Sequence, residues 1–295
     1  MAVGLLCTLL MLAAMPGCGG SAEPTPTPTP EATTLKLRAL LGSSDLAAGK
    51  NRLVLGLIGP TGAPVKASGA ALSLSYLQGE TPVPQGQSQA AFRPWPSGPG
   101  GVFIAQLDFP RAGTWLVEIT PIDGEMKGET ARMAFQVKEQ SATPALGALA
   151  PASKTFTAKD VATLDELTSD PNPDRELYAV SIAQALELKR PFLVTFATPA
   201  FCASATCGPQ VEEVKELRKS YGSRAGFIHV EIYANPKEMQ GDPSKGRIAP
   251  AVQEWGLPSD PWTFIVDAQG KVAAKFEAFA SYEELEEALK QVLPS

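Results

Sequence analysis

The hydrophobic pattern of this chain changes at a stretch of small residues, "QSATPALGALAPASK", which opens a predicted linker at residues 140–155. Before the linker, short apolar runs are separated by Gly/Pro turns, as is typical of β-strands. After it, runs with helical and strand periods alternate, as is typical of an α/β sandwich. A single fold does not account for both patterns. The sequence therefore predicts a multidomain chain with two folded parts.

The first part, residues 35–139, carries six short apolar runs: "LKLRALL", "RLVLGLIG", "AALSLSYLQG", "GVFIAQLDFP", "GTWLVEITPI" and "ARMAFQVKE". Six or seven such runs in about a hundred residues predict an all-β sandwich of immunoglobulin-like type. The part resembles small sandwich modules attached to exported bacterial proteins. Trp115 is a candidate surface aromatic for ligand binding, but an aromatic side chain in such a run is typical of the core, and we expect it there.

The second part, residues 156–295, predicts a β-α-β unit, a hairpin and a final helix. "PFLVTFAT" is a nearly continuous apolar run, typical of a buried parallel strand. The next segment, "CGPQVEEVKELRKSYG", places apolar residues on one helical face: Val211, Val214, Leu217 and Tyr221. We expect its carboxylates to form a solvated face: Glu212, Glu213 and Glu216. "FIHVEIY" predicts a strand, "TFIVDAQGKVAAKFEAF" a hairpin, and the capping-box pair Ser281 and Glu284 starts the last helix.

The first residues, "MAVGLLCTLLMLAAMPGCGG", form an uncharged apolar run that is short for a transmembrane helix and suits a signal peptide, predicted at 1–17. "MPGC" resembles a bacterial lipobox, which implies lipidation of Cys18; ordinary secretory cleavage nearby is the alternative. The alternating Pro-Thr segment that follows predicts an extended spacer, residues 18–34. These features predict an exported lipoprotein, held at the cell membrane on its extracytoplasmic side by a lipid anchor.

Charge argues against nucleic acid as a partner. The net charge is −6, and no block of Lys and Arg appears anywhere in the chain.

The cysteines define the candidate reactive site. Of the four in the chain, Cys7 would leave with the signal peptide and Cys18 would carry lipid, so Cys202 and Cys207 remain as partners in an oxidising compartment. Within one helix their Cα atoms would be about 7.5 Å apart along the axis, beyond the range of a disulfide. We therefore expect Cys202 in a loop and a helix that begins near Cys207. Pro209 fits the first turn of that helix.

This order of elements, with a cysteine pair after the first buried strand, resembles the thioredoxin fold over about residues 177–293. Cys207 begins a "CGPQ" that copies the thioredoxin "CGPC" with Gln210 in place of the second cysteine, whereas by distance from the strand Cys202 matches the first cysteine. Which of the two attacks stays open; if the helix begins at Cys207, we expect the thiol of Cys207 to have the lower pKa. The resemblance implies a cis-proline facing the pair. We assign it to Pro261, with Asp260 before it, and both are candidate substrate-binding residues; Pro258 is the alternative.

The resemblance implies thiol–disulfide exchange through the catalytic residues Cys202 and Cys207, with exported proteins that carry thiols or disulfides as partners and without an organic cofactor or metal. One departure argues the other way, because Thr195 stands where thioredoxins often carry a buried acid. The alternative is therefore a surface binding module with a structural disulfide. His229, the single histidine, is expected to lie half-exposed in its strand rather than to bind copper, as a histidine does in some relatives of the fold.

Overall fold

The structure, a computed structural model, describes residues 37–95, 100–204 and 206–294. The signal peptide, Cys18 and the Pro/Thr spacer, predicted within residues 1–34, lie outside the described residues. From Leu35 onward the chain forms one compact unit. The boundaries predicted at 139/140 and 155/156 stay predictions.

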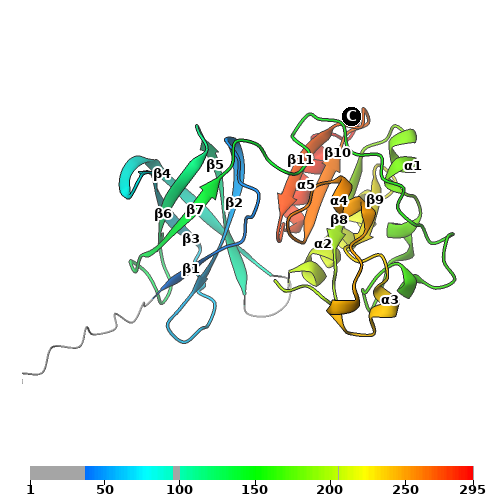
Figure 1. The fold of residues 1–295 in the computed structure, drawn as a ribbon, viewed down its shortest axis with the longest axis horizontal. Helices are drawn as coiled ribbons and strands as arrows, with labels where there is room; N and C mark the ends of the chain where they lie inside the picture. The colour runs from blue at the N-terminus through cyan, green and yellow to red at the C-terminus, as the bar shows by residue number, and fades with distance from the viewer. Residues whose placement is uncertain (1–36, 96–99, 205, 295) are drawn as a thin grey trace, which may run out of the picture. The chain divides into compact units, whose positions relative to one another are not determined.

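The N-terminal part is an antiparallel sheet of seven strands in the order β1-β2-β5-β4-β3-β6-β7 (Figure 1). The strands are β1 (Arg38–Leu41), β2 (Gly49–Ile58), β3 (Gly69–Gln78), β4 (Thr81–Pro94), β5 (Gly101–Phe109), β6 (Gly113–Pro121) and β7 (Ala131–Val137). The all-β prediction is confirmed. The finer assignment to the immunoglobulin type stays a prediction.

The sequence pattern missed one strand. β4 reads "TPVPQGQSQAAFRP", and most of its side chains are exposed, so it has no apolar alternation to detect. Two prolines and a glycine also argue against a strand. Its backbone is nevertheless paired with β3 between Thr81 and Ala91, and with β5 from Ala91 to Pro94. The pairing with β3 is irregular between Leu74 and Ser75, opposite Gly86, which has a φ of 152°.

Trp115 lies in the core of this sheet, as predicted. Its side chain is 1% exposed, and its ring packs edge-on against those of Phe109 and Tyr76. The indole Nε1 donates a hydrogen bond to the Arg111 carbonyl oxygen at 3.2 Å. A buried, hydrogen-bonded tryptophan supports the fold and is not available as a surface binding residue.

The C-terminal part is built on a separate, mixed sheet of four strands in the order β11-β10-β8-β9. β8 (Phe192–Ala197) and β9 (Gly226–Glu231) are parallel, whereas β10 (Trp262–Val266) is antiparallel to β8 and forms a hairpin with β11 (Val272–Glu277). The helices are α1 (Ile182–Glu187), α2 (Cys207–Tyr221), α3 (Pro236–Met239), α4 (Pro250–Glu254) and α5 (Tyr282–Lys290). This is the element order that the thioredoxin resemblance implied.

Helices cover both faces of this sheet (Figure 1). Apolar residues of α2 and α5 share a core with one face of the sheet, and residues of α1 and α4 share a core with the other. The predicted face of α2 is confirmed at Val211, Val214 and Leu217, which are buried. The capping box at Ser281 and Glu284 is also present. The fold therefore holds β8 in the centre, with α2 directly after it.

The expectation for His229 is wrong, because its side chain is only 3% exposed. The short 3₁₀ helix η2 (Arg175–Tyr178) packs on β9, and the Tyr178 hydroxyl lies 2.6 Å from His229 Nδ1. His229 Nε2 lies 3.1 Å from the Ala197 carbonyl oxygen. A carbonyl can only accept, so Nε2 carries a proton. Burial lowers the pKa of the ring, which is therefore a neutral core residue with both nitrogens in contact with a polar partner.

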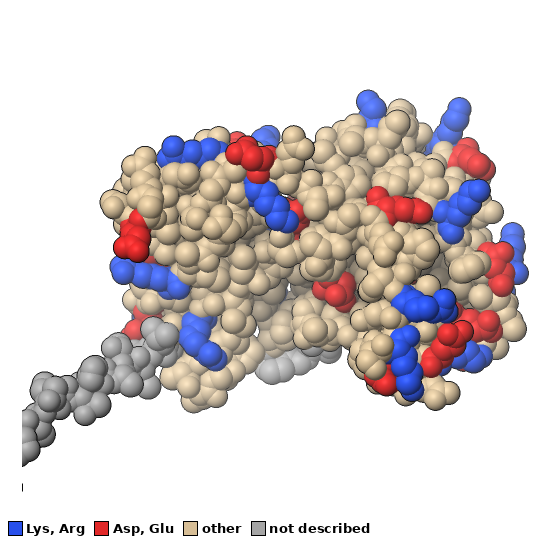
Figure 2. Space-filling view, in the orientation of Figure 1, with Lys and Arg blue, Asp and Glu red and all other residues tan. Residues whose placement is uncertain are grey.

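Two further observations concern the distribution of surface charge and the length and polarity of the helices. On the face drawn in Figure 2, Lys and Arg side chains are interspersed with Asp and Glu. Within residues 37–95, 100–204 and 206–294, no helix combines the length and the apolar character needed to cross a bilayer.

Candidate functional site

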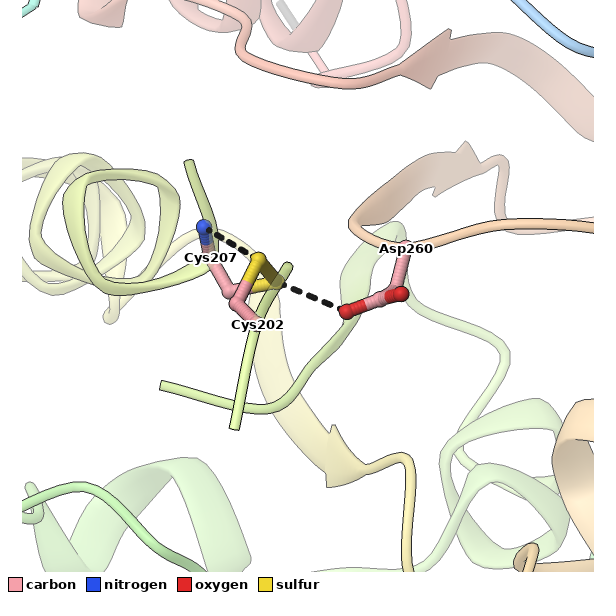
Figure 3. A group of neighbouring side chains, drawn as sticks. All are labelled: Cys202, Cys207 and Asp260. Atoms are coloured by element: carbon pink, nitrogen blue, oxygen red, sulfur yellow. Dashed lines mark hydrogen bonds between the residues drawn. A yellow bond between two sulfur atoms is a disulfide. The ribbon is translucent and has the colours of Figure 1, made fainter. Parts of the chain in front are cut away.

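Cys202 and Cys207 are joined by a disulfide, with their Cα atoms 5.9 Å apart (Figure 3). Cys207 is the first residue of α2, and Cys202 lies in the loop that connects β8 to this helix. The sequence prediction of a loop cysteine bridged to a helical one is confirmed. The pair occupies the end of the central strand, where the first turn of α2 begins.

The start of α2 places hydrogen-bond donors beside the sulfur atoms. Thr206 is the N-cap residue, and Pro209 stands in the first turn, where a missing N–H costs nothing. The Cys207 backbone N–H donates to Cys202 Sγ at 3.3 Å. The N-terminus of a helix also carries a partial positive charge. A thiolate on Cys202 would therefore be stabilised by this end of α2.

The two cysteines differ in their exposure to solvent. Cys207 is 0% exposed, whereas Cys202 is half-buried. The Ser204 hydroxyl lies 3.2 Å from Cys202 Sγ and 2.8 Å from the Thr206 hydroxyl. Of the two cysteines, Cys202 thus combines access for a partner with a donated N–H and a neighbouring hydroxyl. This difference bears on the question, left open by the sequence, of which cysteine attacks.

The loop that precedes β10 also faces the cysteine pair. The Asp260–Pro261 peptide bond is cis, as predicted for Pro261, so the alternative at Pro258 is wrong. The Asp260 Oδ2 atom lies 3.0 Å from Cys207 Sγ (Figure 3). Burial raises the pKa of the Asp260 carboxyl. We expected a substrate-binding role for Asp260, and the structure places its carboxyl against the bridge itself.

Thr195 takes the position that a buried acid often has in thioredoxins, and here it is part of the sheet interior. Its hydroxyl lies 2.9 Å from that of Thr263 on the neighbouring strand, and both side chains are 0% exposed. The carboxyl that reaches the pair instead comes from Asp260, 53 positions after Cys207. The sequence pointed to the residue but not to this contact, because the contact depends on the pairing of β10 with β8, the strand that leads to α2.

A second buried carboxylate supports the loop before Cys202. Glu231, at the end of β9, accepts hydrogen bonds from the Ser169 backbone N–H and hydroxyl, each at 2.8 Å, and burial raises the pKa of its carboxyl. The Ser169 hydroxyl in turn accepts from the Ala200 N–H at 3.1 Å. The Phe201 ring meets the Tyr233 ring edge-on at 5.9 Å. These residues hold the loop in place, and no sequence motif pointed to Ser169.

Among the residues that the structure describes, one group of possible metal ligands comes together. The ligand atoms of Cys202, Cys207 and Asp260 all lie within 4.8 Å of one another. His229 does not belong to this group, because its two ring nitrogens face Tyr178 and the Ala197 carbonyl.

A cavity of about 490 Å³ lies beside the free edge of β9, away from the bridge. Tyr178, His229 and Glu231 contribute to its wall, together with the exposed ring of Phe156, and neither cysteine lines it. The cavity is therefore separate from the site that the cysteine pair and Asp260 form.

No protein-family model matches the chain, and the search of curated proteins found no match. Among solved structures, the chain is similar to a thiol:disulfide interchange protein DsbE of Chlorobium tepidum, with 12% identity, 51% of this chain and 99% of that chain covered, and a TM-score of 0.37. A thioredoxin-family interchange protein of the same organism has 20% identity, coverages of 38% and 85%, and a TM-score of 0.29. The exposed lipoprotein thioredoxin of Streptococcus pneumoniae has 13% identity, coverages of 36% and 89%, and a TM-score of 0.27.

Proposed function

We propose that the chain is an exported thiol–disulfide exchange protein in which Cys202 attacks and Cys207 resolves. The observation that carries the proposal is a disulfide that ends in the first turn of α2 and faces the cis-proline Pro261. A bridge that closes so small a loop adds little stability by restricting the unfolded chain. Cys202 is accessible, the first turn of α2 provides an N–H donor to its sulfur, and the loop with Pro261 faces the bridge. This arrangement suits a disulfide that opens and closes.

Reduction of a substrate proceeds in two displacements. The Cys202 thiolate attacks one sulfur of the substrate disulfide, a mixed disulfide forms, and the other substrate sulfur leaves as a thiolate that takes up a proton. Cys207 then loses its proton and attacks Cys202 Sγ, so the intramolecular bridge forms and the second substrate sulfur leaves. Two electrons pass to the substrate. The reverse sequence oxidises a substrate dithiol, and the relative reduction potentials decide the direction.

The contacts around the pair support these roles. The Cys207 N–H donates to Cys202 Sγ, where the attacking thiolate would form, and the Ser204 hydroxyl at 3.2 Å can donate to that thiolate. Cys207 is buried and lies within hydrogen-bond distance of the Asp260 carboxyl, which can accept its thiol proton. A partner therefore meets Cys202 first, and Cys207 reacts only with the sulfur already beside it.

The loop that carries Asp260 and Pro261 is the proposed contact for a substrate backbone. Pro261 precedes β10 directly, and its carbonyl accepts from the Ala278 N–H at 2.9 Å on the side of the hairpin. An extended peptide could pair with this loop as an added strand, which would align a substrate sulfur with Cys202. The partners would be exported proteins that carry thiols or disulfides.

We further propose a thioredoxin-like C-terminal domain and an immunoglobulin-like N-terminal domain. The strand pairings β1-β2-β5-β4 and β3-β6-β7 are those that immunoglobulin-type domains divide between two sheets. Export and a lipid anchor at Cys18 rest on the sequence motif. Cys18→Ala should release the protein from membranes into the soluble fraction, and membrane retention of this variant would make the lipobox assignment wrong.

The experiment that tests the exchange function is a redox titration of the purified chain against glutathione, with Cys202 and Cys207 followed by thiol labelling. A midpoint well above about −300 mV, within the glutathione range, supports exchange. A bridge that stays closed until the chain unfolds would be structural. That outcome would favour the alternative of a surface binding module.

A further inference from the structure

Three side chains that can bind a metal lie together around the bridge: Cys202, Cys207 and Asp260. Figure 3 shows the Asp260 carboxylate pointing at the sulfur atoms from the facing loop. We propose that the reduced pair and Asp260 form a binding site for a single Zn²⁺ ion. The site rests on the proposed function, because it requires a bridge that opens in the folded protein.

The distances require only small movements. Tetrahedral Zn²⁺ with Zn–S bonds of about 2.3 Å and a Zn–O bond of about 2.1 Å separates two sulfurs by about 3.8 Å and a sulfur from an oxygen by about 3.6 Å. The three ligand atoms already lie within 4.8 Å of one another, and Cys207 Sγ is 3.0 Å from Asp260 Oδ2. Opening the bridge moves the sulfurs apart, toward the spacing that the metal needs.

The two sulfur ligands and one oxygen ligand favour Zn²⁺ over other metal ions. Two thiolates exclude the hard cations Mg²⁺ and Ca²⁺, which take oxygen ligands. A carboxylate as third ligand suits Zn²⁺ better than Cu(I), which prefers sulfur alone. Three protein ligands leave the fourth position to water, which is the arrangement of an exchangeable zinc site rather than a closed structural one.

The groups around the site stabilise the negative charge of the zinc complex. Two thiolates and a carboxylate bring three negative charges against two positive charges of Zn²⁺, so the bound site has a net charge of −1. It lies at the N-terminus of α2, a helix of 15 residues, where negative charge is stabilised. The Cys207 N–H donates to Cys202 Sγ, the Ser204 hydroxyl lies 3.2 Å from it, and both groups would orient this ligand from outside the coordination shell.

Zinc binding and disulfide formation exclude each other, since both use the same electron pairs on sulfur. The two thiols release two protons to bind Zn²⁺, and no electrons move. Zn²⁺ would therefore hold the pair in its reduced state and block attack on a substrate. The site would make exchange activity responsive to the zinc concentration outside the cytoplasm.

The test uses the full chain with Cys7→Ser and Cys18→Ser, so that the pair supplies the only thiols. The protein is reduced with a phosphine, desalted without oxygen, and its two thiols are counted before Zn²⁺ or Co²⁺ is added. We expect one Zn²⁺ per reduced chain, none per oxidised chain, and a sulfur-to-cobalt charge-transfer band with Co²⁺. Asp260→Asn should lower the Zn²⁺ affinity at least about tenfold, since losing even an outer-shell partner costs about 10- to 100-fold.

Glu187→Gln is the matched control, because Glu187 is an exposed carboxylate at the end of α1; it should leave the affinity unchanged. A reduced chain without stoichiometric Zn²⁺, an Asp260→Asn affinity equal to that of Glu187→Gln, or binding of Cu(I) alone would overturn the zinc site and leave exchange intact. A pair that the phosphine reduces and Zn²⁺ occupies, but that glutathione does not titrate, would overturn exchange alone. A bridge that the phosphine opens only on unfolding would overturn both.

Discussion

Cys202 and Cys207 differ in exposure, and this difference separates their roles at the residue scale. With Cys7→Ser and Cys18→Ser as background, Cys207→Ser should trap glutathione as a mixed disulfide on Cys202, because the resolving sulfur is missing. Cys202→Ser should react at least about tenfold more slowly, since Cys207 is buried. Mass spectrometry of the intact chains after exposure to oxidised glutathione measures both. Faster modification of Cys207 would reverse the assigned roles.

His229 is a residue whose burial makes stability depend on pH. Burial lowers its pKa from 6.5 to about 4, with the charges of Asp170 and Lys215 acting in opposite directions. The unfolded chain takes up a proton near pH 6.5, and the folded chain resists it until about pH 4. His229 therefore contributes stability that is fully present above pH 6.5 and is lost as the pH falls toward 4, by up to about 3 kcal/mol.

The measurement compares His229→Gln with the wild type by urea unfolding at pH steps between 4 and 7. The variant should lose this part of the pH dependence, whatever its absolute stability. The difference between the two curves cancels the carboxylates, whose contributions are common to both. Parallel curves would show that His229 does not cause the loss.

At the scale of elements, α2 and α5 pack against each other. The Glu213 carboxylate of α2 lies near this contact, and its ionisation at high pH destabilises the folded chain. Glu213 was expected on a solvated face, but it is half-buried, and burial followed by repulsion from Glu283 raises its pKa to about 7. A raised carboxyl pKa destabilises the folded state as the pH rises from about 4.5 through 7.

Glu213→Gln should therefore stabilise the chain at pH 8 by about 1 kcal/mol, a value reduced for the solvent exposure of the group. At pH 4.5 the same substitution should be close to neutral. Urea unfolding at the two pH values measures the difference. Glu216→Gln, on the exposed side of α2, is the control and should change little at either pH. Equal effects of Glu213→Gln at both pH values would contradict a titrating carboxyl.

The sequence predicted elements whose signals are local. Pro209 and the apolar face of α2 are such signals, and so is the capping box at Ser281. The sequence did not predict features that depend on strand pairing or on contacts between residues far apart in the chain. β4 is polar and holds its place through backbone hydrogen bonds, and His229 is covered by η2, whose sequence carries no regular period. The contact of Asp260 with Cys207 depends on the pairing of β10 with β8, the strand that leads to α2.

At the scale of the whole unit, the N-terminal sheet contacts the loop that carries Asp260. The Ser44 backbone N–H donates to Glu277 Oε1 at 2.7 Å, and its hydroxyl lies 3.1 Å from that of Ser259. Ser259 also donates to Glu277 Oε1 at 2.6 Å and accepts from Trp262 Nε1 at 3.0 Å. Ser259 directly precedes Asp260, so these bonds connect the β-sheet part to one wall of the candidate site.

Arg52 of β2 provides the strongest of these connections. Its guanidinium binds both carboxylate oxygens of Glu284 in α5 at 3.0 Å, and it donates to the carbonyl oxygens of Glu277 and Phe279. The side chains of Arg52 and Glu284 are 7% and 15% exposed. Removing one partner of such a buried pair costs about 3–5 kcal/mol, because the other charge is left without compensation.

Arg52→Met should therefore lower the free energy of unfolding by about 3 kcal/mol and let the two parts unfold in separate transitions. Arg132→Met is the matched control, because its ion pair with Glu118 is exposed, and it should cost less than about 0.5 kcal/mol. Urea unfolding followed by circular dichroism and by tryptophan fluorescence measures both variants. If Arg52→Met unfolded in one transition with the stability of Arg132→Met, Arg52 would not couple the sheet to α5. In that case the loop that carries Asp260 would keep its place without support from the N-terminal part.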